Sequence, residues 1–238
     1  MNKVYACSDV HANLKQFNKL LEFLDDNDKL YVIGDVVDKG PDKLEVLKTI
    51  MKDDRITLLM GNHDLMMLSL LSYIDEPLIN ETDYYKNLYD NWINYNQGSK
   101  TLNAYLKLND NEKKEILDYL FSTPVLLNME VDNKKYILVH AYPLNDGKQD
   151  VYTKDLINEQ TGLLMWYSDY VWERSPFLHI EDKILITGHT PSAYYDSDKI
   201  VHNDYWYDLD CGLAMLQENG KLGVLCLNDL SEIYFDAN

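Results

Sequence analysis

The sequence predicts an α/β fold, in which a parallel sheet in the first half of the chain is followed by a mixed or antiparallel sheet in the second. Strand-like and helix-like patterns alternate up to residue 61, and the short links between them favour right-handed βαβ units. Residues 65 to 121 are helical in pattern, and β-like runs return after them. A helical insertion within a sheet-rich chain accounts for all three observations.

Three short apolar runs mark the strands of the first half: "KVYACS" (3–8), "KLYVIG" (29–34) and "ITLLMG" (56–61). After the first run, Leu14, Phe17, Leu21 and Leu24 recur at helical spacing, with Asn13 as the expected N-cap. A second helix is predicted over "PDKLEVLKTIM" (41–51), because proline is favoured in the first helical turn.

The segment 65–121 is predicted to be a tyrosine-rich helical insertion within a single domain that spans residues 1–238. No repeat, low-complexity tract or Gly/Ser linker indicates a domain boundary. Asp132-Asn133 indicates a hairpin between two β-like runs, and "ENGK" (218–221) indicates another. The β-like runs of the second half are predicted at 124–131, 134–141, 183–189, 206–212 and 221–228.

Composition narrows the possible partners and location. The net charge of −18 argues against nucleic-acid polymers and anionic membranes, because both attract clustered lysine and arginine. Cys7, Cys211 and Cys226 lie in apolar runs and are odd in number, so we expect buried, reduced thiols. The chain begins with a strand and has no apolar run of membrane-spanning length, so we expect a cytoplasmic location.

Polar side chains follow five of the apolar runs at the point where each run ends. Because the carboxyl ends of strands in an α/β sheet converge on one rim, we expect these side chains to lie together. They are Asp9, His11, Asp35, Asn62, His63, His140 and His189. Oxygen and imidazole donors suit Mn²⁺, Fe or Zn²⁺, whereas the lack of thiolates disfavours a structural zinc site. Six or so ligands fit two ions that share a carboxylate and lie about 3.5–4 Å apart.

Each of these residues has a simpler interpretation when it is taken alone. Asp9 could cap the following helix, Asp35 could be a turn residue, and His140 could be a core histidine. The shared position at strand ends favours the metal site over these separate explanations. His179 and His202 do not follow the pattern, and we expect them to be surface or core residues.

Five motifs in order resemble those of calcineurin-like metallophosphoesterases, and most closely the phosphoprotein phosphatase branch with its bacterial and phage members. They are Asp9-x-His11, "GDVVDKG" (34–40), "GNHD" (61–64), His140-Ala141 and "GHTP" (188–191). "NQGSKTL" (96–102) and "DLDCG" (208–212) resemble further stretches of this branch. The resemblance implies a β-sandwich of two mixed sheets flanked by helices.

The resemblance also implies two divalent transition-metal ions, with Mn²⁺ expected before Fe or Zn²⁺. Carried over residue by residue, it assigns Asp9, His11 and Asp35 to the first ion. Asp35 would bridge to a second ion, which Asn62, His140 and His189 complete. A hydroxide bridging the two ions would attack phosphorus in line. His63 would act as general acid for the leaving oxygen, and Asp38 would orient its imidazole and keep it protonated. Otherwise Asp38 would be a solvated turn residue.

Three positions depart from the family pattern and concern substrate binding. Lys39 stands where arginine is usual; lysine binds phosphate as a point charge but lacks the bidentate fork. Ser168 stands where bacterial members carry arginine, and Tyr142 stands where glycine is usual. We expect Lys39 and Asn62 to contact the phosphate. Arg174 either replaces the missing arginine or is an exposed residue.

The sequence therefore predicts a dinuclear-metal phosphoesterase that hydrolyses phosphate monoesters, with a phosphorylated protein or a small phosphate ester as substrate. A symmetrical dinucleoside-tetraphosphate hydrolase is the alternative enzyme. Aromatic residues between Tyr84 and Tyr95 would then stack on a base, although such residues at helical spacing more often pack in a core. A non-catalytic module that binds phosphate is the alternative from another class, and His63 and Asp38 argue against it.

Overall fold

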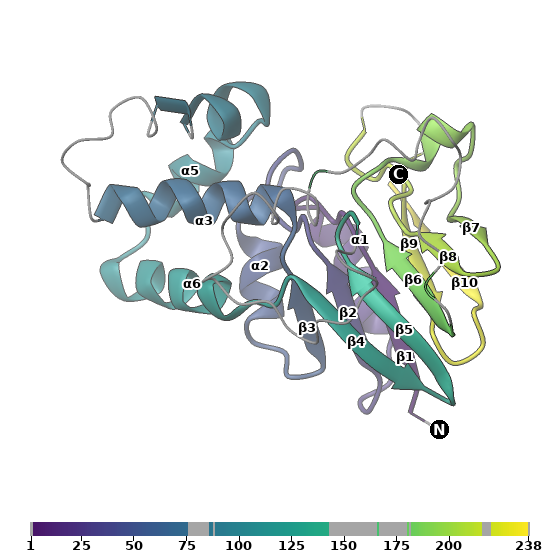
Figure 1. Ribbon diagram of the computed structural model, residues 1–238. Coiled ribbons are helices and arrows are strands. Elements are labelled where there is room, and N and C mark those ends of the chain that lie inside the picture. Colours follow the sequence, from purple (N-terminus) through teal and green to yellow (C-terminus); the bar gives the residue numbers. More distant parts are fainter. Residues whose placement is uncertain are drawn as a thin grey trace.

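Two five-stranded sheets form the centre of the computed structural model, which describes residues 2–75, 86–87, 89–142, 166, 180, 182–215 and 220–237. The sheets face each other, and helices α1 (Leu14–Phe23) and α2 (Glu45–Ile50) cover the outer face of the first (Figure 1). The remaining long helices gather at one end of the molecule. The predicted architecture of two mixed sheets flanked by helices is confirmed.

The first sheet has the strand order β10-β9-β1-β2-β3. Its parallel part contains β1 (Val4–Cys7), β2 (Lys29–Ile33) and β3 (Ile56–Leu59), as the sequence predicts. Two strands from the end of the chain, β9 (Lys221–Cys226) and β10 (Glu232–Asp236), extend it in the antiparallel sense. Strand β10 was not predicted from the sequence.

The second sheet has the order β4-β5-β6-β8-β7 and is mixed, as predicted. A hairpin joins β4 (Leu126–Val131) to β5 (Lys134–Val139) through Asp132 and Asn133, whose φ angles of 49° and 64° suit a tight turn. Strands β6 (Lys183–Thr187) and β8 (Trp206–Asp208) run parallel to β5, and β7 (Val201–Asn203) closes the edge.

The hairpin predicted at 218–221 is wrong, because the predicted strands on its two sides correspond to β8 and β9, which lie in different sheets. Residues 218 and 219 themselves lie outside the described part of the chain. Asn13 occupies the N-cap position of α1 as predicted, but its side chain does not accept a hydrogen bond from the helix. The Asn13 side chain donates to the carbonyl oxygens of Val10 and His11, and Asp42 Oδ2 accepts the Leu14 N–H at 2.9 Å instead. Helix α2 begins at Glu45, four residues after the predicted start at Pro41.

The helical segment between β3 and β4 contains α3 (Asn62–Asp75), the short π-helical turn η1 (Asp90–Tyr95), α5 (Ser99–Tyr105) and α6 (Asp110–Ser122). Helix α6 begins with a capping box between Asn109 and Glu112. Helix α3 begins three residues before the predicted start of the insertion. Asn62 and His63 therefore lie in the first turn of helix α3 and not at the end of a strand.

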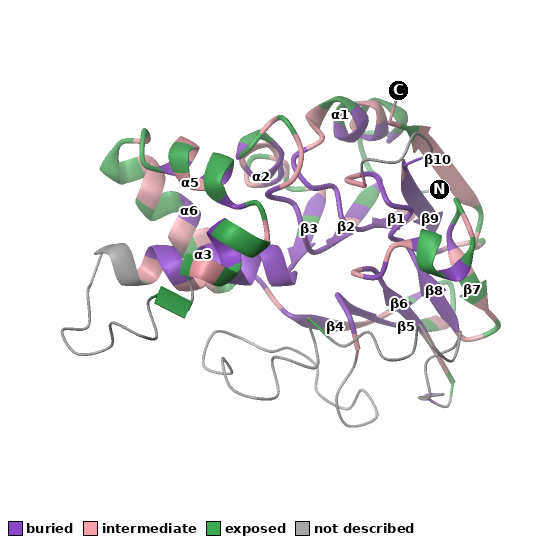
Figure 2. Cartoon of the chain, turned by 90° about the horizontal axis from the view of Figure 1, so that it is seen from above, coloured by how far each residue is buried: buried purple, intermediate pink, exposed green. Residues whose placement is uncertain are grey.

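Alternating side chains of the first sheet fill two cores. Ala6, Ile33 and Leu59 pack toward the second sheet, whereas their strand neighbours Cys7 and Val32 pack in the core shared with the helices. Viewed from above, the chain between the two sheets is mostly buried (Figure 2). All three cysteines are buried and free, as predicted.

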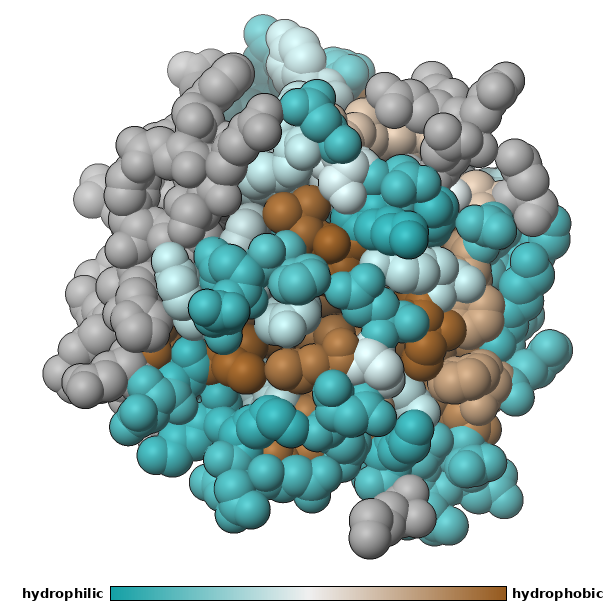
Figure 3. Space-filling model, turned by 90° about the vertical axis from the view of Figure 1, so that its right-hand side faces the viewer, coloured by the Kyte–Doolittle hydropathy of each residue, from teal (hydrophilic) through white to brown (hydrophobic). Residues whose placement is uncertain are grey.

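The surface is in keeping with the acidic composition. Hydrophilic side chains dominate the face seen in Figure 3, and apolar residues show in its central part and toward its right-hand side. Within the described residues, none of the helices is both long and apolar enough to span a membrane.

Candidate metal centre and catalytic pair

The loops that follow β1, β2 and β3 in the first sheet meet the loops that follow β5 and β6 in the second. They bring together the six residues predicted to bind metal, and five of these side chains are fully buried, with His189 partly exposed. The six are Asp9, His11, Asp35, Asn62, His140 and His189. Residues 180 positions apart in the chain are thus direct neighbours, as in the contact between His189 and Asp9.

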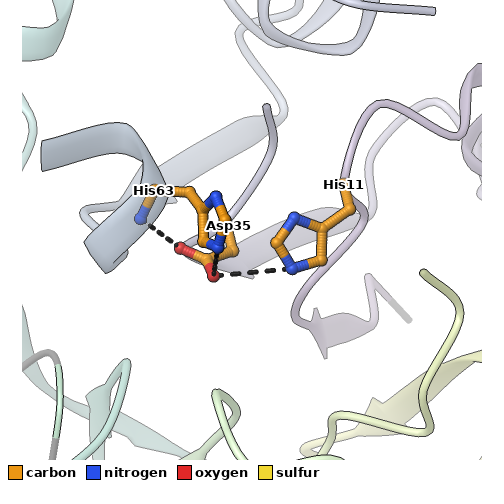
Figure 4. A group of neighbouring side chains, drawn as sticks. All are labelled: His11, Asp35 and His63. Carbon is orange, nitrogen blue, oxygen red and sulfur yellow. Dashed lines mark hydrogen bonds and ion pairs between the residues drawn. The ribbon is translucent and has the colours of Figure 1, made fainter. Parts of the chain in front are cut away.

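Asp35 lies at the centre of the cluster, and its two carboxylate oxygens face different partners. Oδ2 lies 3.5 Å from His11 Nε2 and 4.0 Å from His63 Nε2, and the two imidazoles approach it from two sides (Figure 4). Oδ1 lies 3.5 Å from His140 Nε2. A carboxylate placed in this way has one oxygen available for each of two ions.

The donors on the Oδ1 side of Asp35 form a compact group. Asn62 Oδ1 lies 2.9 Å from His140 Nε2 and 3.1 Å from His189 Nδ1. Ligand atoms of Asp35, His140 and His189 all lie within 4.8 Å of one another. This group matches the set that the sequence predicts for the second ion.

The donors on the Oδ2 side of Asp35 are spaced less closely than those on the Oδ1 side. Ligand atoms of His11, Asp35 and His63 lie within 4.8 Å of one another, and Asp9 Oδ1 is 3.8 Å from His11 Nε2. Asp9 does not cap the following helix. Its Oδ2 accepts the His189 backbone N–H at 2.9 Å and so links the two groups.

Backbone carbonyls fix which ring nitrogen of each histidine faces the centre. His11 Nδ1 donates to the Val37 carbonyl at 2.9 Å, and His140 Nδ1 donates to the Ile33 carbonyl at 2.8 Å. In both residues Nε2 is therefore the atom that points at Asp35. An imidazole held by its other nitrogen is the usual arrangement of a metal-ligating histidine.

The backbone is strained at several residues of the centre and at Asp38. Asp9, His11, Asp35, Asp38 and His189 have φ angles of 52°, 44°, 57°, 67° and 72°, in the left-handed region that favours glycine. Such conformations cost about 1–3 kcal/mol each and cluster at functional sites. Gly61 allows one further close approach, since a Cβ there would lie 2.2 Å from Asp35 Oδ1.

The buried carboxyl groups indicate a local excess of negative charge. Burial, together with the neighbouring Asp35, raises the pKa of Asp9 to about 6. Burial and nearby carboxylates also raise the pKa values of Asp208 and Asp210 well above their usual range. Buried carboxylates are stable as anions only when cations or donors face them. The donor set and its charge therefore fit two divalent cations.

The three histidines differ in protonation because their surroundings differ. Burial alone would lower the pKa of His140, but the carboxylates of Asp35 and Asp9 outweigh it and raise the pKa to about 10. Burial and the charge on His140 lower the pKa of His189 to about 3. Burial, with Lys39 nearby, lowers the pKa of His11 well below its usual value. Of these three imidazoles, only that of His140 thus carries a second proton, and with it a positive charge, at neutral pH.

Lys39 is the predicted phosphate-binding cation, and it reaches into the centre. Its Nζ lies 2.9 Å from His11 Nε2, at the face where the first ion is predicted. Arg174, Ser168 and His179 lie outside the described residues, so the predicted role of Arg174 stays a prediction. His202 stacks on Tyr207, away from the six residues, as the sequence analysis expected of it.

His63 and Asp38 form the predicted pair. His63 Nδ1 lies 2.8 Å from Asp38 Oδ2, and both side chains are buried. Asp38 is 2% exposed, so the alternative of a solvated turn residue is wrong. The free Nε2 of His63 faces Asp35 and the centre.

Three residues that contact the site were not assigned a role from the sequence. Asp64 is fully buried and accepts the backbone N–H groups of Asp35 at 2.8 Å, Val36 at 3.1 Å and Gly61 at 3.1 Å. It therefore holds the loop that carries Asp35. The other two, Trp92 and Thr101, donate to Asp38. In the sequence, Asp64 belongs to "GNHD", Trp92 to the aromatic cluster between residues 84 and 95, and Thr101 to "NQGSKTL".

Comparisons with known sequences agree with this geometry. A sequence model of the calcineurin-like phosphoesterase family matches residues 2–225. A symmetrical bis(5'-nucleosyl)-tetraphosphatase of Buchnera aphidicola is 30% identical over 167 residues, which are 66% of this chain and 58% of that protein. Serine/threonine-protein phosphatase 2 of Escherichia coli is 25% identical over 175 residues, 71% of this chain and 69% of that protein. The chain thus spans less than two thirds of the first of these relatives.

Solved structures show the same fold at lower sequence identity. A protein serine/threonine phosphatase from Saccharomyces cerevisiae superposes with a TM-score of 0.61 at 13% identity, covering 100% of this chain and 80% of that chain. A metallophosphoesterase from Sphaerobacter thermophilus gives a TM-score of 0.56 at 16% identity, covering 99% and 87%. The chain belongs to the calcineurin-like phosphoesterase family.

Proposed function

We propose that this phosphoesterase hydrolyses phosphate monoesters with two divalent ions, and that phosphorylated serine or threonine in proteins is the substrate class that fits best. The observation that carries the proposal is the pairing of two features. Donors on both sides of Asp35 suit two ions, and a buried Asp38–His63 pair faces the same centre. A proton donor is needed most when the leaving group is an alkoxide, as in a serine or threonine ester.

The ions would be held by Asp9, His11 and Asp35 on one side and by Asp35, Asn62, His140 and His189 on the other. Bound there, they would supply positive charge for the phosphate oxygens and a water of lowered pKa. Mn²⁺ suits this mixture of oxygen and imidazole donors, as Fe and Zn²⁺ do.

The protein's own side chains supply the remaining steps. Lys39 Nζ and the Asn62 amide lie at the centre and would bind phosphate oxygens. His63 Nε2 would give its proton to the leaving oxygen, while Nδ1 stays bonded to Asp38. Asp64 keeps Asp35 in place through the backbone of its loop.

Symmetrical hydrolysis of dinucleoside tetraphosphates is the second candidate, and the similarity to the Buchnera enzyme favours it. Its leaving group would be a nucleoside diphosphate, which is a weak base and depends less on a proton donor. Base stacking by the aromatic cluster receives only partial support. Trp92 is fully buried and bonded to Asp38, whereas Tyr95 is 78% exposed.

Activity measured after chelation and reconstitution with Mn²⁺ tests the proposal. The panel contains a phosphoserine peptide, p-nitrophenyl phosphate and diadenosine tetraphosphate. We expect turnover of the peptide and of p-nitrophenyl phosphate, restored by Mn²⁺. Efficient cleavage of diadenosine tetraphosphate alone, with two molecules of ADP as product, would replace the first candidate by the second. Binding of phosphate without turnover of any of the three would overturn both.

A further inference from the structure

We propose that Trp92 and Thr101, from the helical segment, are positioning residues that hold the general acid His63 through Asp38. The proposal rests on the function proposed above for His63. It gives the segment 90–105 a part in leaving-group chemistry, beyond its packing on the sheet.

Asp38 accepts three hydrogen bonds from three different elements. Trp92 Nε1 donates to Oδ2 at 2.7 Å, and His63 Nδ1 lies 2.8 Å from the same oxygen. Thr101 Oγ1 donates to Oδ1 at 2.6 Å. Because Trp92 and Thr101 bond different oxygens, the carboxylate cannot turn about its terminal torsion without breaking one of these bonds.

The type of donor fixes where the hydrogen on His63 lies. Trp92 Nε1 donates to Oδ2 and Thr101 Oγ1 donates to Oδ1, so both oxygens of Asp38 serve as acceptors, as in an ionised carboxylate. The hydrogen between Oδ2 and His63 then belongs to Nδ1. His63 is thereby oriented with Nε2 toward the centre, where it can carry the proton for a leaving oxygen. Trp92 thus acts on the tautomer as well as on the position of His63.

A close backbone contact brings the two donors to the same carboxylate. A Cβ on Gly98 would lie 2.4–2.6 Å from three atoms of the Trp92 indole, and the Gly98 N–H donates to the Trp92 carbonyl at 2.9 Å. Gln97, with φ of 61°, makes the turn before it. Only glycine allows α5 to start against the indole, and α5 then places Thr101 at Asp38. This accounts for the stretch "NQGSKTL".

A purely structural role predicts a different outcome from a positioning role. Trp92 and Thr101 are both fully buried, so their loss is expected to lower stability in either case. A structural role would reduce activity on all substrates alike. A positioning role would reduce it only where the leaving oxygen needs a proton.

The test compares Trp92→Phe and Thr101→Val with matched controls. Each variant removes a donor and keeps most of the side-chain volume. Trp206→Phe is the first control, because Trp206 is a buried indole that donates to Thr187 and does not contact Asp38. Thr123→Val is the second, because the Thr123 hydroxyl donates to the Tyr119 carbonyl. Gly98→Ala should reproduce Trp92→Phe by displacing the indole.

The kinetic readout is the ratio of kcat/KM for an alkyl phosphate to that for p-nitrophenyl phosphate. We expect this ratio to fall about tenfold in Trp92→Phe and in Thr101→Val. This is less than the roughly 10²–10⁴-fold effect of removing a general acid, because His63 is still present but held less firmly. The controls should keep the wild-type ratio. Metal content should be the same in all variants.

A second readout does not depend on activity. In the Zn²⁺-loaded protein, the proton on His63 Nδ1 should give a far-downfield NMR signal, identified by its absence in His63→Asn. Both variants should shift or broaden this signal, and the controls should not. An unchanged signal with an unchanged substrate ratio overturns the positioning role. If the wild type hydrolyses none of the substrates, the proposed function fails, and the NMR signal alone decides whether Trp92 and Thr101 hold His63.

Discussion

Metal binding is expected to release a proton from His140 at neutral pH. The carboxylates of Asp35 and Asp9 outweigh burial and raise the pKa of His140 to about 10, so the imidazole is protonated at pH 7 in the metal-free protein. Its Nδ1 already donates to the Ile33 carbonyl, so the second hydrogen lies on Nε2, the atom that faces Asp35. An ion can bind there only after that proton has left.

The size of the effect follows from the distance between the pH and this pKa. At pH 7 the proton should weaken metal binding by about a thousandfold, since each unit between pH and pKa is a factor of about ten. Affinity should therefore rise about tenfold per pH unit between pH 7 and 9. Below pH 6 the slope should steepen, because the pKa of Asp9 is raised to about 6 by burial and Asp9 then also holds a proton. The lowered pKa values of His11 and His189 leave these two residues neutral, without a proton to release.

Calorimetric titration with Mn²⁺ in buffers of different ionisation enthalpy measures the protons released. Water bound to the ions can also release a proton. The informative quantity is therefore the number of protons released by the wild type minus the number released by His140→Asn. We expect the wild type to release close to one proton more than the variant at pH 7. Equal release by both, or an affinity that stays flat between pH 7 and 9, would falsify the assigned protonation of His140.

Four further predictions concern single side chains. His63→Asn should lower turnover of alkyl phosphates by about 10²–10⁴-fold, and that of p-nitrophenyl phosphate much less. Metal analysis of this variant should match the wild type; a missing ion would make His63 a ligand. Asp64→Asn should weaken Mn²⁺ binding by about 10–100-fold, because an NH2 group replaces one of the two oxygens that accept N–H groups around the Asp35 loop. Recovery of kcat at high Mn²⁺ checks this. Lys39→Ala should raise KM for phosphate esters, with equal or tighter metal binding in a titration. Arg174→Ala should raise KM and weaken inhibition by phosphate, and kinetics equal to the wild type would exclude it from the site.

The sequence predicted the residues at the centre because their signal is local. Asp9, Asp35 and His140 each follow directly after an apolar strand, and the topology of such sheets brings strand ends together. The hairpin at Asp132 was predictable for the same reason, since two residues of turn chemistry separate two apolar runs. Where a short segment carries the whole signal, the prediction and the structure agree.

Contacts between distant segments could not be predicted in this way. Trp92 and Thr101 lie 54 and 63 residues from Asp38 in the chain, and neither differs in type from an ordinary core residue. The return of β9 and β10 to the first sheet was missed for a related reason. An apolar run shows that a strand forms but not which sheet it joins, and the wrongly predicted hairpin at 218–221 followed from that ambiguity.

The acidic composition and a phosphate substrate are compatible once distance is taken into account. The net charge of −18 is spread over the molecule, and its effect falls off over a screening length of about 8–10 Å. Two divalent ions would bring four positive charges to the centre, and Asp9 and Asp35 would remove two of them. The phosphate would meet this positive charge in direct contact, with Lys39 beside it. The same buried carboxylates that repel a phosphate in the metal-free protein are then the groups that hold the charge attracting it. Catalysis in this chain is expected to depend on metal loading more steeply than in a site lined by arginine.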